Sequence, residues 1–111
     1  YKETADLEAE LPGLDVLYMT RIQKERFFNE EDYLRLKGCY SLNAKLLQLA
    51  QPDMPVLHPL PRIDEIKLDV DNDPRAAYFD QVHNGVYIRM AIILALLGIP
   101  DPLTGKKVLE C

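Results

Sequence analysis

A short apolar run that ends in two prolines limits the possible folds of this chain more than any other feature. Residues 54–62 read Met-Pro-Val-Leu-His-Pro-Leu-Pro-Arg, and the apolar pair Val56–Leu57 predicts a short buried strand. Pro59 and Pro61 have no N–H, so the strand must end there, and the carbonyl groups beside them stay free as acceptors. Ligands of open parallel α/β sheets bind at the carboxyl ends of the strands. The stretch therefore indicates either a binding loop or an ordinary strand exit shaped by two prolines.

The composition is that of one small globular domain. The chain has 111 residues, 48% hydrophobic and 28% charged, which is unlike a disordered segment. Its 13 basic and 18 acidic residues give a net charge of −5, which argues against a nucleic-acid partner. The longest apolar run, Met90–Leu97, is too short to span a bilayer. Cys39 and Cys111 have no metal-ligand spacing and suggest no disulfide framework, so we expect reduced thiols in a cytoplasmic protein.

A second predicted strand, Leu14–Met19, leads into a polar segment with a candidate anion-binding arginine. In extended backbone, Arg21 and Gln23 project to the same side. A guanidinium group suits a carboxylate because its planar fork can bind both oxygens. On spacing alone, however, a solvated basic turn is the simpler interpretation.

Helix signals surround these strands. Capping residues predict three short helices, which run from 5 to 11 after Thr4, from 30 to 37 after Asn29, and from 44 to 50 after Ser41 or Asn43. The last of these should turn Ala44, Leu47 and Leu46 towards the core.

A long helix is predicted near the end of the chain. It should start at Pro74, with Asp73 as its N-cap, and stop before Gly98. From Met90 onwards almost no polar residue remains, and a helix that is apolar all round must be buried all round. We therefore expect its second half to pack on an absent domain or another subunit, and Gly85 to mark close packing or a bend.

Alternating aspartates before this helix resemble the start of a calcium loop. Asp69, Asp71 and Asp73 have the right spacing, but Pro74 stands where the loop needs glycine and Asp80 where it needs glutamate. We therefore predict no metal site.

Three stretches of the chain, taken together, resemble aspartate carbamoyltransferase catalytic chains. They are Leu14–Arg26 (LDVLYMTRIQKER), Val56–Glu65 (VLHPLPRIDE) and Asp73–Leu97 (DPRAAYFDQVHNGVYIRMAIILALL), in the order of that family. The related ornithine carbamoyltransferases typically have a cysteine after the loop histidine. Pro59 takes that place here, which favours aspartate as the substrate.

The resemblance implies an α/β fold that is part of a doubly wound parallel-sheet domain. Residues 1–73 would belong to the aspartate-binding domain, 74–98 to a long helix that crosses back to an N-terminal carbamoyl-phosphate domain, and 99–111 to a tail. The implied reaction is attack of the L-aspartate amine on carbamoyl phosphate. It gives N-carbamoyl-L-aspartate and phosphate in de novo pyrimidine synthesis, without cofactor or metal.

The resemblance also implies residue roles. Arg21 and Gln23 would contact L-aspartate, Leu60 and Pro61 would contact carbamoyl phosphate through loop carbonyls, and Arg26, His58 and Pro59 would organise the site. The resemblance predicts a cis Leu60–Pro61 bond. Arg62 and Glu65 are expected to hold the loop, with each other as candidate partners. We expect structural roles for His83 and Arg89.

Several parts of the family's site do not occur in this sequence. The Ser-x-Arg-Thr phosphate loop and the lysine-bearing loop lent by a neighbouring subunit are absent, so we expect no catalytic residue here and take the chain as part of a longer one. The implied partners are the N-terminal domain, a homotrimer of catalytic chains and, in some members, regulatory chains. Two alternatives stay open: a truncated, non-catalytic homologue that binds anions or serves assembly, and a carbamoyltransferase with another amine substrate.

Overall fold

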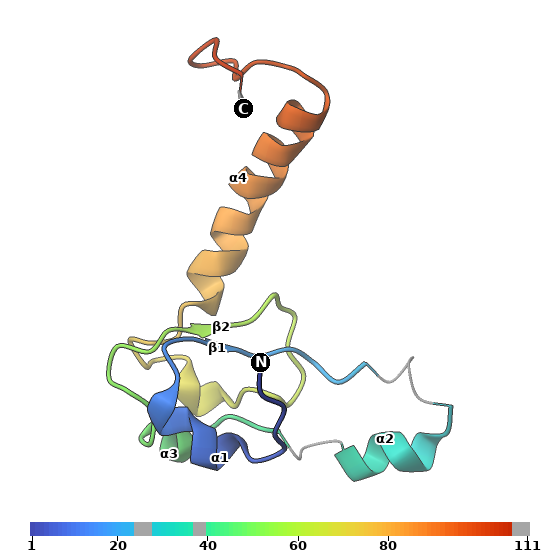
Figure 1. Ribbon diagram of the computed structural model, residues 1–111, viewed down its shortest axis with the longest axis vertical. Coiled ribbons are helices and arrows are strands. Elements are labelled where there is room, and N and C mark those ends of the chain that lie inside the picture. Colours follow the sequence, from blue (N-terminus) through green and yellow to red (C-terminus); the bar gives the residue numbers. More distant parts are fainter. Residues whose placement is uncertain (24–27, 37–39, 108–111) are drawn as a thin grey trace. The chain divides into compact units, whose positions relative to one another are not determined.

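The computed structural model describes residues 1–23, 28–36 and 40–107 (Figure 1). It divides into two compact units, Tyr1–Tyr78 and Phe79–Cys111. The elements of the first unit are α1 (Leu7–Glu10), the 3-10 turn η1 (Leu11–Gly13), β1 (Leu17–Tyr18), α2 (Glu30–Leu36), α3 (Ala44–Leu47), β2 (Val56–Leu57) and the 3-10 turn η3 (Leu68–Val70). Helix α4 (Tyr78–Leu96) makes up most of the second.

The two strands are parallel neighbours, as an α/β fold requires. The register pairs Leu17 with Val56 and Tyr18 with Leu57. The N–H of Met19 donates to the carbonyl oxygen of Leu57 at 2.8 Å. Parallel pairing needs a long crossover between the strands, and α2 and α3 lie in that crossover. The predicted class, mixed α/β with a parallel sheet and a C-terminal helix, is confirmed.

The strand predicted from Leu14 is shorter than expected and is buried on one face only. The N–H of Leu14 donates to the carbonyl oxygen of Leu11 at 3.3 Å, so the start of the predicted strand belongs to the preceding turn. Leu17 and Met19 are buried, whereas the side chain of Tyr18 is exposed. The alternation follows from the period of two along a strand.

Helix α4 begins at Tyr78 rather than at Pro74, because the residues before it pair with β2. The N–H of Val56 donates to the carbonyl oxygen of Arg75 at 2.8 Å, and the N–H of Ala77 donates to that of Val56 at 3.0 Å. These bonds form an isolated parallel bridge on the second edge of β2. Strand pairing therefore overrides the local helix signal of the proline.

Asp73 does not cap α4 but forms an ion pair with Arg75. Its carboxylate accepts from the Arg75 backbone N–H at 2.9 Å and from Nε at 2.8 Å. The Arg75 side chain also donates to the carbonyl oxygen of Leu47 (2.9 Å), the last residue of α3, and to that of Gln51 (3.1 Å). The hydrogen bond from Arg75 lowers the pKa of Asp73 below its usual range.

Two of the short helices start at side-chain caps. Asp6, and not Thr4 as predicted, caps α1 by accepting the N–H of Ala9 at 3.0 Å. Asn43, one of the two predicted candidates, caps α3 by accepting the N–H of Leu46 at 2.9 Å. Each cap satisfies a backbone donor that the first turn of a helix leaves unpaired.

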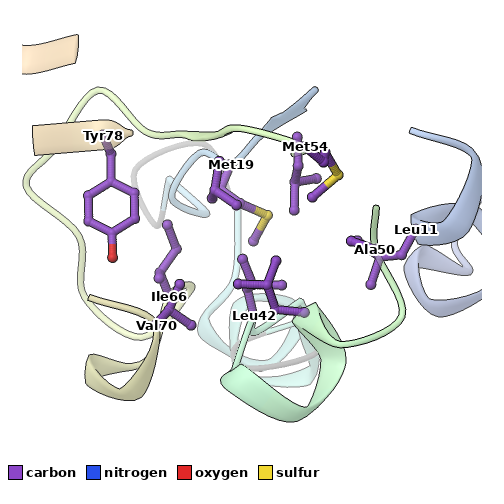
Figure 2. Close-up of a cluster of buried hydrophobic side chains, with 11 residues drawn as sticks. Leu11, Met19, Leu42, Ala50, Met54, Ile66, Val70 and Tyr78 are labelled. Atoms are coloured by element: carbon purple, nitrogen blue, oxygen red, sulfur yellow. The ribbon is translucent and has the colours of Figure 1, made fainter. Parts of the chain in front are cut away.

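The core of the first unit gathers side chains from both strands, α3, η1, η3 and the connecting loops (Figure 2). Its buried members are Leu11, Leu17, Met19, Leu42, Leu47, Ala50, Met54, Val56, Ile66, Val70 and Tyr78. Of the predicted inner stripe of α3, Leu47 is fully buried and Leu46 packs against this core. The strand ends are thus held by packing beneath the sheet.

The end of α4 matches the prediction. Gly98 has φ +65°, its N–H donates to the carbonyl oxygen of Ala95 at 3.1 Å, and the N–H of Ile99 donates to that of Leu94 at 2.9 Å. These two hydrogen bonds form the Schellman motif, which favours glycine at its left-handed position.

The side chains of α4 are largely exposed in the described residues. The large apolar ones with more than a third of their surface exposed are Phe79, Val82, Val86, Tyr87, Ile88, Met90, Ile92, Ile93 and Leu96. A Cβ at Gly85 would meet only the Arg89 side chain, at an ordinary 3.6 Å. The described residues therefore show no close packing at Gly85, and the alternative, a bend, stays a prediction. None of the helices in the described ranges is long and apolar enough to cross a membrane.

Candidate active-site pocket

A pocket of about 700 Å³ lies where the two parallel strands end. The edge pocket, as we call it, is lined by Thr20, Arg21, Ile22 and Gln23 after β1 and by His58, Pro59, Leu60 and Pro61 after β2. Adjacent parallel strands bring their carboxyl ends to the same edge of the sheet. The pairing of β1 with β2 therefore brings together two segments that lie far apart in the sequence.

The edge pocket contains most of the residues predicted to form a site. Arg21 is exposed and Gln23 is half-buried, so both side chains can reach a ligand. Thr20 and Ile22 also line the pocket, although they were not predicted as site residues from the sequence. Their position between the end of β1 and Gln23 is the sequence signal that could have indicated them. Arg26, predicted to organise the site, lies outside the described residues.

The proline loop, residues 58–62 after β2, has the backbone conformation that the resemblance predicted. The Leu60–Pro61 peptide bond is cis, and Leu60 has φ +47°, a left-handed conformation that is costly for a residue with a Cβ. The N–H of Leu60 donates to Nδ1 of His58 at 2.8 Å. In the described residues, no backbone N–H donates to the carbonyls of Pro59, Leu60 or Pro61.

His58 and Glu65 form a buried pair behind this loop. The two side chains are 1% and 5% exposed, and Nε2 lies 2.8 Å from Oε1. The other carboxylate oxygen accepts the backbone N–H groups of Ile63 (3.1 Å) and Asp64 (3.0 Å). Burial raises the pKa of Glu65, but the backbone N–H donors and His58 together outweigh it, so the pKa is lowered overall.

Arg62 does not pair with Glu65, contrary to the prediction. Its guanidinium group forms a two-pronged ion pair with Asp71, in which Nη2 lies 2.6 Å from Oδ2. It also donates to the Tyr78 hydroxyl at 3.2 Å and lies 5.6 Å from the centre of that ring. The hydrogen bond from Arg62 lowers the pKa of Asp71. Two separate polar clusters therefore hold the loop. Glu65 pairs with His58, and Arg62 pairs with Asp71.

Asp71 and Tyr78 are loop-holding residues that the sequence does not reveal. In the sequence, Asp71 belongs to an incomplete calcium pattern and Tyr78 to a predicted helix. The signal available was a run of alternating aspartates close to two arginines, Arg62 and Arg75. No group of three His, Cys, Asp or Glu side chains in the described parts of the chain could hold a metal ion.

The fold and the edge pocket together define a class of domain. An arginine and a rigid proline loop meet at the carboxyl edge of parallel strands, which is the ligand-binding edge of doubly wound α/β domains. The profile of the aspartate/ornithine carbamoyltransferase Asp/Orn-binding domain matches residues 1–96. The chain belongs to the aspartate/ornithine carbamoyltransferase family and corresponds to that domain.

Curated relatives have the same family name. The aspartate carbamoyltransferase catalytic subunit of Bifidobacterium longum subsp. infantis is 58% identical over 97% of this chain and 35% of its own length. That of Lachnoclostridium phytofermentans is 61% identical over 89% of this chain and 32% of its own. The chain thus spans about a third of the length of these relatives.

Solved structures support the same relationship. Aspartate transcarbamoylase from Trypanosoma cruzi, in complex with carbamoyl aspartate and phosphate, superposes with a TM-score of 0.69 at 44% identity. The superposition covers 78% of this chain and 28% of that one. The complex of the same enzyme with N-(phosphonacetyl)-L-aspartic acid gives a TM-score of 0.68, also at 44% identity, and covers 78% of this chain and 27% of that one.

Proposed function

We propose that this chain is the L-aspartate-binding part of an aspartate carbamoyltransferase. The whole protein would transfer the carbamoyl group of carbamoyl phosphate to the amine of L-aspartate, giving N-carbamoyl-L-aspartate and phosphate for pyrimidine synthesis. The observation that carries this proposal is the edge pocket, in which Arg21 and the proline loop line a common cavity. Further support comes from the T. cruzi enzyme, which has been solved with carbamoyl phosphate and aspartate bound.

Arg21 is the proposed ligand of an aspartate carboxylate. Its exposed side chain lines the pocket, and its planar fork can donate two parallel hydrogen bonds to a carboxylate. Gln23 lies two residues further along and adds an amide that both donates and accepts. We assign both residues to the L-aspartate side of the site.

The proline loop is the proposed partner of carbamoyl phosphate. An NH₂ group needs acceptors, and Leu60 and Pro61 belong to a loop whose carbonyls receive no backbone N–H from the described residues. Holding the amine in one orientation favours reaction by reducing the freedom that must be lost in the transition state. Pro59 and His58 shape the loop, and we assign Arg26 a similar organising role.

The exposed apolar side chains of α4 support a partner domain. We infer that α4 packs on an N-terminal carbamoyl-phosphate domain, because so many large apolar groups in one helix are otherwise left in water. We further infer a cytoplasmic homotrimer of catalytic chains, with regulatory chains as further candidate partners. The step itself needs no cofactor in this proposal.

A binding experiment on the full-length protein tests the proposal. Succinate mimics the two carboxylates of L-aspartate, and its affinity is measured by calorimetry with and without carbamoyl phosphate. We expect succinate to bind when carbamoyl phosphate is present, since both ligands would share the edge pocket. Failure to bind under that condition would count against L-aspartate as the substrate.

Arg21 variants sharpen the test. Arg21→Ala should raise the KM for L-aspartate on the order of a hundredfold, because charge-assisted bonds to a carboxylate are lost. Arg21→Lys should lie between Arg21→Ala and the wild type, since the charge remains but the fork does not. Lys45→Ala, an exposed basic residue on α3, is the matched control and should leave this KM unchanged. An unchanged KM in Arg21→Ala would remove Arg21 from the site.

A further inference from the structure

The buried pair behind the proline loop leaves little freedom for the protons on His58. Nδ1 lies 2.8 Å from the backbone nitrogen of Leu60, and Nε2 lies 2.8 Å from Oε1 of Glu65. A backbone N–H can only donate, so Nδ1 must be the acceptor and must lack a proton. The neutral ring then has its proton on Nε2 and donates it to Glu65.

Glu65 is itself restricted to accepting. Its Oε2 receives two backbone N–H groups, from Ile63 and Asp64, and an ionised carboxylate has no proton to give. The proton that Nε2 must hold is therefore donated to Oε1. The two hydrogen bonds that link Glu65, His58 and Leu60 therefore permit one tautomer of the His58 ring.

The hydrogen bond from Leu60 to His58 acts on a residue with an unfavourable backbone conformation. Leu60 has φ +47°, a left-handed region that is unfavourable for a residue with a Cβ. The bond from its N–H to His58 stabilises that conformation. The orientation of the carbonyls on either side, the proposed acceptors of the carbamoyl amine, depends on the same backbone angles.

We propose that Glu65 is a positioning residue that selects the Nε2–H tautomer of His58, so that the ring holds Leu60 and sets the loop carbonyls for carbamoyl phosphate. The inference rests on the proposed function for the identity of the ligand. The tautomer itself rests only on the hydrogen bonds that His58 makes with Leu60 and Glu65. Glu65 is not among the described residues that line the edge pocket, and it acts through His58.

The tautomer can be measured directly by long-range ¹H–¹⁵N correlation NMR. The chain has only two histidines, and His83→Gln assigns the signals. We expect His58 to show a protonated Nε2 and a bare Nδ1 at neutral pH. A protonated Nδ1, or an even mixture of the tautomers, would overturn the proposal.

Glu65→Gln tests the selection by changing one oxygen to an NH₂ group. The two backbone N–H groups should take the remaining amide oxygen, so the NH₂ group should face Nε2 and move the ring proton to Nδ1. That proton would oppose the Leu60 N–H. We expect the NMR pattern to shift to the Nδ1–H tautomer, and the KM for carbamoyl phosphate in the full-length protein to rise about tenfold.

Asp53→Asn, an exposed carboxylate before β2, is the matched control and should change neither value. An unchanged tautomer in Glu65→Gln would refute the selection by Glu65.

Two His58 variants separate positioning from mere support of the fold. Asn at position 58 offers an acceptor near Nδ1, as in an Asx turn, whereas Gln places a donor near Nε2 only. We expect the carbamoyl phosphate KM to stay within about threefold in His58→Asn and to rise about tenfold in His58→Gln. Equal values, or a better His58→Gln, would contradict positioning of Leu60.

The two proposals fail in different ways. If the wild-type full-length protein transfers no carbamoyl group, the proposed function is wrong, whereas the tautomer measurements still decide the role of Glu65. If a variant does not fold, as judged by circular dichroism, the wild-type NMR pattern still tests the tautomer that the proposal requires, and a protonated Nδ1 overturns it.

Discussion

Tyr78 is fully buried, yet its hydroxyl lies among charged groups. It donates to Asp71 and accepts from Arg62, and it stands at the junction where the extended segment becomes α4. Burial raises the pKa of Tyr78 to about 12, and the bond to Asp71 acts in the same direction, whereas Arg62 lowers it. The hydroxyl is therefore protonated in the folded chain at pH values where a free tyrosine ionises.

This pKa predicts an alkaline loss of stability. A tyrosine whose folded pKa is raised stabilises the fold fully below pH 10, and its contribution is lost as pH rises from 10 towards 12. We expect the free energy of unfolding, from urea titrations, to fall on the order of 2 kcal/mol more in the wild type than in Tyr78→Phe over that range. Equal losses in the two proteins would show that Tyr78 does not titrate this way.

Other single residues differ in how well their surroundings could be predicted. Arg21 and Gln23 could be predicted only through the family resemblance, because on spacing alone a solvated basic turn is the simpler interpretation, and both line the edge pocket. The partners of Arg62 could not, because Asp71 and Tyr78 are reached only through the fold. An ion pair is decided by distance in space, and the sequence offered Arg62 several acids at similar separations along the chain.

At the scale of elements, β2 is the strand on which the first unit depends. Val56 pairs with Leu17 on one side and forms a bridge with Ala76 on the other. Its side chain is fully buried. The short strand thus joins the segment before the edge pocket to the segment before α4.

Val56→Ala should therefore weaken the whole first unit. Loss of two buried methyl groups and the resulting cavity should lower the free energy of unfolding by about 2 kcal/mol. Val16→Ala removes the same atoms from a side chain that is 48% exposed, and should cost less than about 0.5 kcal/mol. Chemical denaturation followed by circular dichroism measures both, and similar losses in the two variants would contradict the central place of β2.

The start of α4 shows where element prediction fails. Asp73 and Pro74 form a good local helix start, but Arg75 and Ala77 bond to Val56 instead. A strand edge offers hydrogen bonds that no local pattern reveals. The other end, at Gly98, was predicted correctly because its left-handed backbone is a local property.

At the scale of the molecule, the two units differ in how their apolar groups are covered. The first unit buries a continuous core, whereas α4 leaves most of its large apolar side chains exposed in the described residues. The family relatives are about three times as long as this chain. Both facts support the proposed packing of α4 on a partner domain.

We predict that the purified 111-residue chain has no measurable turnover. Its edge pocket is lined by Arg21, the proposed carboxylate ligand, and by the proline loop, but the sequence holds no Ser-x-Arg-Thr loop to bind the phosphate group. A colorimetric assay for carbamoyl aspartate with both substrates checks this, with the full-length protein as the positive control. Appreciable product from the short chain would show that it has all the groups needed for transfer.

The amino-acid sequence by itself determined the local features of this protein. Two prolines ended β2, Gly98 ended α4, Asn43 capped α3, and the motif stretches identified the family. These features depend on neighbours a few residues away, so their physical causes can be read from the chain directly.

Only the tertiary structure decided which distant groups meet. The parallel pairing of β1 with β2 brought Arg21 beside the proline loop, and packing beneath the sheet enclosed the bond between His58 and Glu65. Such contacts depend on which strand edges and buried surfaces come together, and many arrangements share the same local pattern. Their selection is a property of the folded core as a whole.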